Sequence, residues 1–351
     1  MTTSETERAA AAKAAGSNLG ARLVAVVLLG VVVYGAIVVV RGADKISAEL
    51  KTFAWWTFAA ACGLSFANYL LRFLKWEYYL GVLGLRRDGE GRRLMSVSES
   101  FLVFLSGFVL TVTPGKVGEM FKSLVLFELK GIEVERTAPI VVAERVTDLV
   151  GVIVLITVGG ASFPGGLFWG GIGAAFVGLL LAIVAVPRFS ALLLAPMRRL
   201  PGRAGRVAER FLPKVDRALG QLRQLTAPRH LVAPSLFSIA GWALEGIGVF
   251  LVLRGFGSSL DPFRATFFYA TATLAGALVP VPGGLGVTEK VLEESMVAIG
   301  GVPGSVSTAT MILSRLATLW FAVLVGFIAL GALRFRYPTL LSRKAPAEER
   351  A

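Results

Sequence analysis

Long apolar segments recur along the chain and are separated by shorter polar or basic stretches. A helix rises about 1.5 Å per residue and the hydrocarbon core of a bilayer is about 30 Å thick, so a spanning helix needs about 20 mostly apolar residues. Six segments meet this length: approximately residues 20–40, 53–71, 138–160, 167–186, 231–252 and 306–332. The pattern therefore predicts an all-α integral membrane protein with six spanning helices.

Two further apolar stretches are shorter, and each runs directly into a Pro-Gly pair. Residues 98–113 end at Pro114-Gly115 and residues 265–281 end at Pro282-Gly283, and the amphipathic segments 116–129 and 285–299 follow. Proline disfavours the α conformation in the residue before it, and glycine permits a sharp reversal of the chain. We therefore expect two re-entrant helical hairpins, each returning to the side from which it enters. Two pairs of short or tilted spanning helices are the alternative.

The distribution of Lys and Arg predicts the orientation of the chain in the membrane. Four segments that would lie on one side, 1–22, 72–95, 187–230 and 334–351, hold 24 of the 36 basic residues, whereas the opposite segments 41–52 and 253–264 hold five. Both termini are therefore predicted to be cytoplasmic (N-in, C-in). Residues 187–230 would form a cytoplasmic basic loop and residues 333–351 a cytoplasmic tail.

Composition agrees with a membrane protein and removes several classes of function. Hydrophobic residues make up 55% of the chain and charged residues 17%, against about 45–50% and about 25% in soluble proteins. The net charge of +13 would indicate nucleic acid in a soluble chain, but here the basic residues lie mostly in loops, so we expect no nucleic acid partner. Cys62 and His230 are the only residues of their types, which excludes an intramolecular disulfide and a cysteine zinc site. No metal site and no cofactor are expected.

A short motif occurs twice and predicts an internal repeat. The pattern P-G-x-aliphatic-G comprises Pro114, Gly115, Lys116 and Gly118 in its first copy and Pro282, Gly283, Gly284 and Gly286 in its second. Each copy is followed by an amphipathic segment and by a span that carries one arginine, Arg145 or Arg315. The duplicated units cover about 53–160 and 231–332, and the assigned orientation makes them inverted relative to one another.

Inverted repeats with broken helices are a recurrent transporter design, in which half-helix N-termini face the substrate. Such termini present free backbone N–H groups and bind anions, phosphate above all. The alternative is that the glycines only allow the hairpin arms to pack closely, as small residues do in membranes.

Charged residues within the predicted spans require a partner, a cavity or a function, because an isolated charge at the bilayer centre is costly. Glu144 and Asp148 share one helical face beside Arg145. They could line a cation or proton path or hold a lipid amine; the alternative is a buried ion-pair network with Arg315 or Lys116. Arg315 lies about ten residues inside its span, too deep to reach water easily, and is a candidate phosphate contact.

Three further carboxylates join the candidate substrate-binding residues. Glu119 and Glu289 follow the two Pro-Gly breaks, and Glu245 lies in the middle of its span with no charge in its own helix to pair with. A protonated, hydrogen-bonded carboxyl and a proton-coupling group are both consistent with Glu245. The most specific hypothesis is that Arg145 and Arg315 bracket the phosphate of one lipid headgroup, because a guanidinium matches phosphate oxygens well.

Several motifs together resemble those of a known family. They are NYLLRFLKWEYYL at 68–80, PGKVGE at 114–119, AERVTDL at 143–149, PVPGGLGVTE at 280–289 and SRL at 314–316. In these motifs the chain resembles the lysylphosphatidylglycerol synthase transmembrane, or flippase-like, family, whose members are linked to lipid movement. The resemblance implies functional positions at Pro114, Gly115, Gly118, Glu119, Glu144, Arg145 and Asp148, and at Pro282, Gly283, Gly284, Gly286, Glu289 and Arg315. Only eighteen residues follow Leu333, so lysine transfer by an aminoacyltransferase domain is not expected here.

The expected function is that of a single flippase-like transmembrane domain, residues 1–332, in the bacterial cytoplasmic (inner) membrane. It would move an anionic lipid, either a phospholipid or a polyprenyl-phosphate-linked lipid, between leaflets. The alternative is a membrane scaffold or accessory subunit for a separate lipid synthase or glycosyltransferase. We expect no enzyme activity, because the sequence has no nucleophile elbow, clustered metal ligands or phosphate-binding loop. The expected partners are lipids with anionic headgroups, and the sequence leaves a homo-oligomer or a partner lipid-modifying enzyme open.

Overall fold

A computed structural model describes residues 42–113, 118–161, 216–279 and 281–341, together with the single positions 34, 39, 167, 168, 171, 172, 175, 178 and 179. In chain order the helices are α3 (Ala43–Thr52), α4 (Trp55–Val82), α5 (Val97–Ser106), α6 (Phe121–Lys130), α7 (Val134–Gly160), α11 (Pro228–Gly255), α12 (Pro262–Leu278), α13 (Val287–Ala298), α14 (Gly304–Arg315) and α15 (Phe321–Arg336). Short 3-10 turns lie at Gly107–Leu110 (η1) and Pro282–Gly284 (η3), and a π-helical turn at Leu316–Trp320 (η4) joins α14 to α15. The described part of the chain contains no strand, so the all-α prediction is confirmed there.

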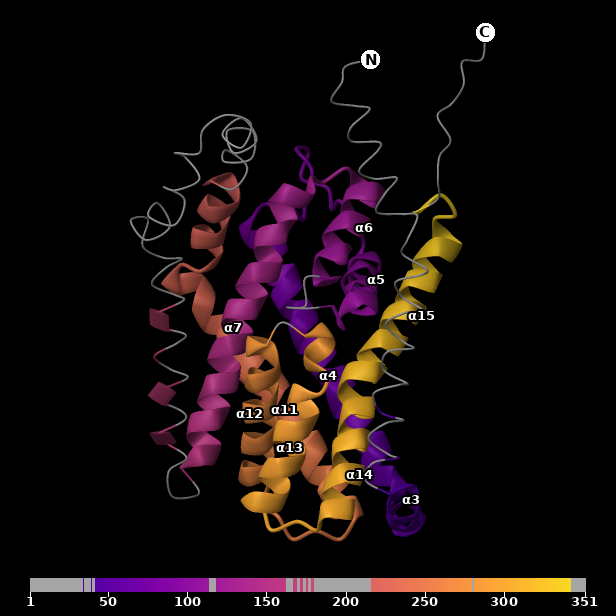
Figure 1. Cartoon of the computed structure of the whole chain (residues 1–351). Helices are drawn as coiled ribbons and strands as arrows, with labels where there is room; N and C mark the ends of the chain where they lie inside the picture. Colours follow the sequence, from indigo (N-terminus) through magenta and orange to yellow (C-terminus); the bar gives the residue numbers. More distant parts are fainter. Residues whose placement is uncertain are drawn as a thin grey trace, which may run out of the picture.

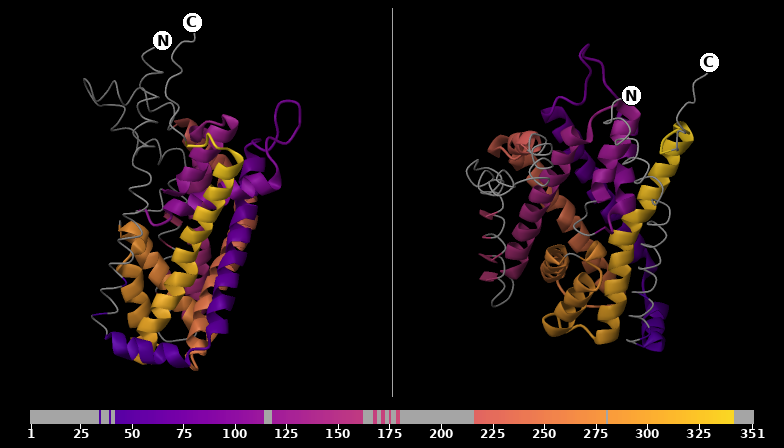
Figure 2. Two further views of the ribbon diagram at one scale, coloured as in Figure 1. Left: turned by 90° about the vertical axis from the view of Figure 1, so that its right-hand side faces the viewer. Right: turned by 45° about the horizontal axis from the view of Figure 1, so that its top comes forward.

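Within the described residues, three helices are long and apolar enough to cross a membrane: α4, α11 and the continuous stretch Gly304–Arg336, which comprises α14, η4 and α15. Helix α7 has 27 residues, nearly the length of α4, but carries Glu144, Arg145 and Asp148 near its middle. The predicted spans 20–40 and 167–186 fall almost entirely outside the described residues. Helix α3 is too short to span and lies across one end of the bundle (Figure 2), where Ser305 donates a 2.7 Å hydrogen bond to Glu49.

Both predicted hairpins have the helix–break–helix form. Helix α5 and η1 precede α6, and α12 precedes α13; the first pair occupies one half of the bundle and the second pair the other half (Figure 1). In the second break, Gly283 and Gly286 have φ values of 63° and 85°, a backbone region that only glycine enters freely. In the first break, residues 114–117 lie outside the described residues.

The two breaks approach each other in the interior of the bundle. Val112, at the end of the first arm of one hairpin, packs in a buried cluster with Leu285 of the other hairpin and with Leu319 and Val323. A Cβ atom added to Gly283 would lie 3.0 Å from a methyl carbon of Val112. The segments that contain the two motifs are therefore neighbours in space.

Each hairpin packs on a long helix that belongs to the other half of the chain. The first hairpin packs through α5 and η1 on α15, the last helix of the second half, and the second hairpin packs through α12 on α7, the last helix of the first half. Gly326 of α15 and Gly159 of α7 allow this, since an added Cβ would lie 2.6 Å from the backbone of Val109 and 2.7 Å from that of Phe263, respectively. Reciprocal packing of this kind is what two related units produce when they associate.

Helices α4 and α11 pack along one another at the centre of this arrangement. Three glycines of α11 at intervals of seven residues, Gly241, Gly248 and Gly255, face α4; a Cβ at Gly241 would lie 2.2 Å from Oδ1 of Asn68. Small residues let helix backbones approach closely where hydrocarbon surrounds them. This contact sets the distance between the polar side chains that α4 and α11 carry.

Candidate functional site

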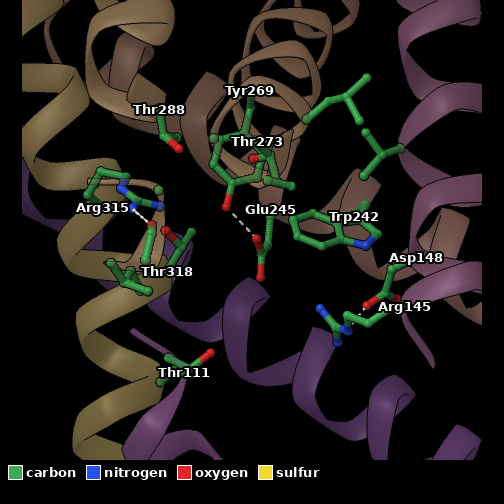
Figure 3. Close-up of a pocket in the computed structure, with 18 of the residues that line it drawn as sticks. Thr111, Arg145, Asp148, Trp242, Glu245, Tyr269, Thr273, Thr288, Arg315 and Thr318 are labelled. Carbon is green, nitrogen blue, oxygen red and sulfur yellow. Dashed lines mark hydrogen bonds and ion pairs between the residues drawn. The ribbon is translucent and has the colours of Figure 1, made fainter. Parts of the chain in front are cut away.

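A cavity of about 330 Å³ lies beside the second hairpin break and the end of the first arm of the first hairpin. Side chains of α4, α7, α11, α12 and the η4 region line it (Figure 3). Its charged lining residues are Arg72, Arg145, Arg315, Asp148 and Glu245. Its hydroxyl-bearing lining residues are Tyr69, Thr111, Thr113, Tyr269, Thr273, Thr288 and Thr318. The cavity thus combines a mostly apolar lining with charged and hydroxyl groups, and its charged side chains are three cations and two anions.

Two of the arginines share one carboxylate. Glu119, which is 1% exposed, lies 2.9 Å from Nη2 of Arg72 and 3.0 Å from Nη2 of Arg145. Nη2 of Arg145 also lies 2.8 Å from Oδ2 of Asp148. The buried Nε atoms of Arg72 and Arg145 have no hydrogen-bond partner within the described structure. Each guanidinium group therefore has a buried N–H without a partner, and the two side chains also line the cavity.

Two fully buried lysines extend this charge cluster. Nζ of Lys75 lies 2.6 Å from Oδ1 of Asp148 and donates to Oγ of Ser238 at 2.7 Å. Nζ of Lys122 lies 2.6 Å from Oε2 of Glu144 and 4.7 Å from the centre of the Trp76 ring. These contacts neutralise two charges that would otherwise be costly at membrane depth.

The cluster has an excess of positive charge. Among the described residues it contains four basic side chains and three acidic ones: Arg72, Lys75, Lys122 and Arg145 against Glu119, Glu144 and Asp148. With all seven groups ionised, one positive charge has no counterpart within this cluster. Of the four basic residues of the cluster, Arg72 and Arg145 line the cavity. A ligand in the cavity would therefore meet the excess positive charge through these two side chains.

Arg315 is held differently, on the second hairpin. Its Nε lies 2.6 Å from Oε1 of Glu289, and its Nη2 donates to the carbonyl oxygen of Gly283 at 2.9 Å. Glu289 also accepts from the hydroxyl of Tyr34 at 2.9 Å and from the N–H of Gly286 at 2.7 Å. Arg315 therefore connects α14 to both the break and the first turn of α13.

The two Glu–Arg pairs occupy equivalent positions after the two Pro-Gly motifs. Glu119 and Arg145 are separated by 26 residues, and so are Glu289 and Arg315. In each case a carboxylate at the start of a hairpin's second arm binds a guanidinium on the next long helix. The pairs differ in one respect: Glu119 binds a second arginine, Arg72, whereas Glu289 binds Arg315 together with a neutral tyrosine.

Glu245 lies between these two arrangements (Figure 3). Its Oε1 accepts from Nδ2 of Asn68 at 2.6 Å and its Oε2 accepts from the hydroxyl of Tyr269 at 2.5 Å. The hydrogen-bonded carboxyl expected from the sequence is therefore present. Within the described residues Glu245 forms no ion pair.

The structure brings together some of the residues that the sequence singled out. Arg145, Asp148, Glu245, Gly283, Gly284 and Arg315 line the cavity. Gly118, Glu119, Glu144, Pro282, Gly286 and Glu289 lie behind it or in the breaks and do not line it. Pro114, Gly115 and Lys116 fall outside the described residues.

Two expectations about charged residues were wrong. The partners of Glu144 and Asp148 are Lys122, Lys75 and Arg145, and Arg315 binds neither carboxylate. Arg72 and Lys75 were assigned to a cytoplasmic segment beginning at residue 72, but α4 continues to Val82 and buries both side chains. The error arose because the predicted span ended at the first charge, although the apolar and aromatic residues of FLKWEYYLGV continue beyond it.

Comparison with known proteins places the chain among membrane proteins. Residues 23–326 match the family described as "Lysylphosphatidylglycerol synthase TM region". A UPF0104 membrane protein of Methanocaldococcus jannaschii is 24% identical over 230 residues, which cover 63% of this chain and 92% of that protein. UPF0104 membrane proteins of Methanothermobacter thermautotrophicus and Pyrococcus horikoshii are 25% and 28% identical over 120 and 108 residues. These two matches cover 34% and 30% of this chain and only about a third of each relative, 36% and 32%.

Proposed function

The chain belongs to the lysylphosphatidylglycerol synthase TM region family, and on this premise we propose that it is a membrane lipid transporter that moves an anionic lipid between leaflets. The excess positive charge beside the cavity carries this proposal. A cation at membrane depth requires a counter-charge, and the phosphate of a phospholipid or of a polyprenyl-phosphate-linked lipid supplies one in the bilayer itself.

In this proposal Arg72 and Arg145 bind the phosphate. Their Nε atoms are buried and without partners, and both side chains line the cavity. Arginine donates in a planar fork that fits phosphate oxygens, and charge-assisted hydrogen bonds are stronger than neutral ones. Arg315 also lines the cavity, but its Nε and Nη2 are engaged by Glu289 and Gly283, so we assign the phosphate to Arg72 and Arg145 in preference to the pair Arg145 and Arg315. Arg315 instead holds the second hairpin in place.

The size of the cavity limits what enters it. Ligand pockets that enclose drug-sized molecules have volumes of about 300–1,000 Å³, and this cavity of about 330 Å³ is at the lower end. It accommodates a headgroup, so the acyl or prenyl chains would remain in the surrounding hydrocarbon. Large apolar side chains exposed on the surface of the long helices, among them Leu74, Val158, Leu324 and Ile328, fit such a lipid environment.

The proposed topology places the cavity near the middle of the bacterial cytoplasmic membrane. Six helices would span, with both termini in the cytoplasm, and the two hairpins would enter from opposite sides as re-entrant segments. The position of the hairpins in opposite halves of the bundle and their approach at Val112 and Gly283 support this arrangement. Residues 1–332 would then form one transmembrane domain and residues 333–351 a cytoplasmic tail.

Reconstitution into liposomes tests the proposal. Fluorescent phosphatidylglycerol, phosphatidylethanolamine and phosphatidylcholine are incorporated separately, and the fraction of label reaching the outer leaflet is followed with a membrane-impermeant reductant. We expect the protein to accelerate movement of the anionic lipid above the rate in protein-free liposomes. The same assay is run with a fluorescent polyprenyl phosphate. A scaffold for a separate lipid synthase or glycosyltransferase would give no acceleration for any of the four lipids, and that result would reject the transporter.

A further inference from the structure

Among the described residues, Glu245 differs from the other carboxylates around the cavity in having no cationic partner. Glu119 binds Arg72 and Arg145, Asp148 binds Lys75 and Arg145, and Glu289 binds Arg315. Glu245 is only 7% exposed and lies in the middle of α11, yet its contacts are with the neutral donors of Asn68 and Tyr269. An ionised carboxylate in such a place lacks a direct ion pair and would depend on the more distant positive charge around the cavity.

In the described structure, the groups around Glu245 are either neutral or already held in ion pairs. Helix α4 contributes Asn68, Tyr69 and Arg72; α7 contributes Arg145 and Asp148; α12 contributes Tyr269 and Thr273; and the α14–η4 region contributes Arg315 and Thr318. The three arginines already contact Glu119, Asp148 or Glu289, and Asp148 contacts two cations. Of the two described carboxylates that line the cavity, Asp148 is held in ion pairs and Glu245 is not, so Glu245 is the one that can gain a proton without breaking an ion pair.

We propose that Glu245 takes up one proton when an anionic headgroup enters the cavity. This inference rests on the proposed function and adds the ion to which lipid binding is coupled. A phosphate held by Arg72 and Arg145 brings a negative charge into the low-dielectric cavity that Glu245 also faces. Repulsion between the two anions favours the neutral carboxyl. The phosphate would then replace ionised Glu245 as the negative charge opposite the excess positive charge of the cluster, so that the total charge around the cavity stays the same.

Linkage makes the effect reciprocal. If the bound phosphate favours protonation of Glu245, protonation favours the bound phosphate by the same factor. For one coupled proton, the affinity for the headgroup falls by up to about tenfold for each unit of pH increase, over the range in which Glu245 is ionised in the free protein and protonated in the complex. A pH difference across the membrane would then bias the direction in which the lipid moves.

Calorimetry on the detergent-solubilised full chain measures the coupling. Dioctanoyl phosphatidylglycerol is titrated in two buffers of different ionisation enthalpy at several values between pH 5 and pH 9, and the number of protons taken up follows from the difference in observed enthalpy. We expect uptake to reach about one proton per lipid in the wild type and to stay near zero in Glu245→Gln, which keeps a hydrogen-bonding side chain. Glu293→Gln is the matched control, because Glu293 is also buried but does not line the cavity; its uptake is expected to equal that of the wild type.

A second variant covers the case in which Glu245→Gln does not fold. Tyr269→Phe removes one donor from the carboxylate, which weakens the ionised form, so the pH range of proton uptake is expected to move upward. Binding without proton uptake at any pH would overturn this inference and leave the proposed function intact, whereas absence of binding would count against both. A third outcome is that dioctanoyl phosphatidylethanolamine binds more tightly than phosphatidylglycerol, without proton uptake, and that Glu245→Gln abolishes this preference. Glu245 would then bind the headgroup ammonium, and the inference would be overturned.

Discussion

Buried charges in this protein are arranged so that most of them are satisfied in pairs. Lys122 and Glu144 form the simplest pair: both side chains are at most 2% exposed, and neither lines the cavity. Lys122 also packs over the rings of Trp76 and Phe104. Such a pair adds little net stability, but removal of one member leaves a buried charge without a partner.

The first prediction follows from this asymmetry. Lys122→Met leaves Glu144 unpaired and is expected to lower the free energy of unfolding by about 3–5 kcal/mol. The double variant Lys122→Met/Glu144→Gln removes both charges, keeps the cluster one positive charge in excess, and should regain most of the loss. Thermal unfolding in detergent measures both. A double variant no more stable than the single one would show that the ion pair is not the reason for the loss.

Arg145 and Arg315 are expected to separate binding from stability. Arg145→Gln leaves Glu119 paired with Arg72 and Asp148 paired with Lys75, so the melting temperature should change little. Headgroup affinity should fall about ten- to hundredfold, because a charge-assisted hydrogen bond of about 1.5–3 kcal/mol is lost. Arg315→Gln leaves Glu289 without a cation and frees Gly283, so it should mainly lower the melting temperature. Lipid titration and unfolding of both variants test this, and the reverse pattern would restore Arg315 as the phosphate ligand.

At the scale of helices, close packing depends on glycines at specific positions. Gly326 of α15 meets the backbone of η1, whereas Gly331 on the same helix has no atom within 4 Å of an added Cβ. Overpacking costs about 1–3 kcal/mol, and alanine is the better helix former at an open site. Gly326→Ala should therefore destabilise the protein, and Gly331→Ala should leave it unchanged or slightly more stable. Equal melting temperatures for the two variants would contradict the packing of the first hairpin on α15.

The sequence was sufficient to predict the helical pattern of the hairpins but not all of their contacts. Pro-Gly pairs act locally, so the breaks before α6 and α13 follow from residue chemistry alone. The exchange of hairpins between α7 and α15 depends on tertiary packing, which no local pattern records. The same reason accounts for the wrong placement of Arg72. An arginine at the end of an apolar segment is typical of the membrane surface, and the sequence does not show that Glu119, 47 positions away, binds it in the interior.

At the scale of the whole molecule, the topology can be tested without reference to transport. In a Cys62→Ala background, a cysteine in place of the exposed Glu90, in the loop between α4 and α5, should be protected from an impermeant thiol reagent added to intact cells. A cysteine in place of the exposed Ser259, between α11 and α12, should react. The two positions are expected on opposite sides because α4 and α11 cross the membrane in opposite directions: the N–H of Ala54, at the start of α4, donates to the carbonyl oxygen of Gly255, at the end of α11. The opposite labelling pattern would reverse the proposed orientation.

The central claim is that a lipid phosphate neutralises the excess positive charge of the cluster around Glu119. Arg72→Gln tests it most directly, because it makes the described cluster neutral while Glu119 keeps Arg145 as its partner. Movement of fluorescent phosphatidylglycerol is measured in liposomes that contain equal amounts of wild type, Arg72→Gln or Lys290→Gln; Lys290 is exposed and pairs only weakly with Glu294, at 3.8 Å. We expect Lys290→Gln to match the wild type and Arg72→Gln to be slower by about tenfold or more. Transport at the wild-type rate by a correctly folded Arg72→Gln protein would contradict the account.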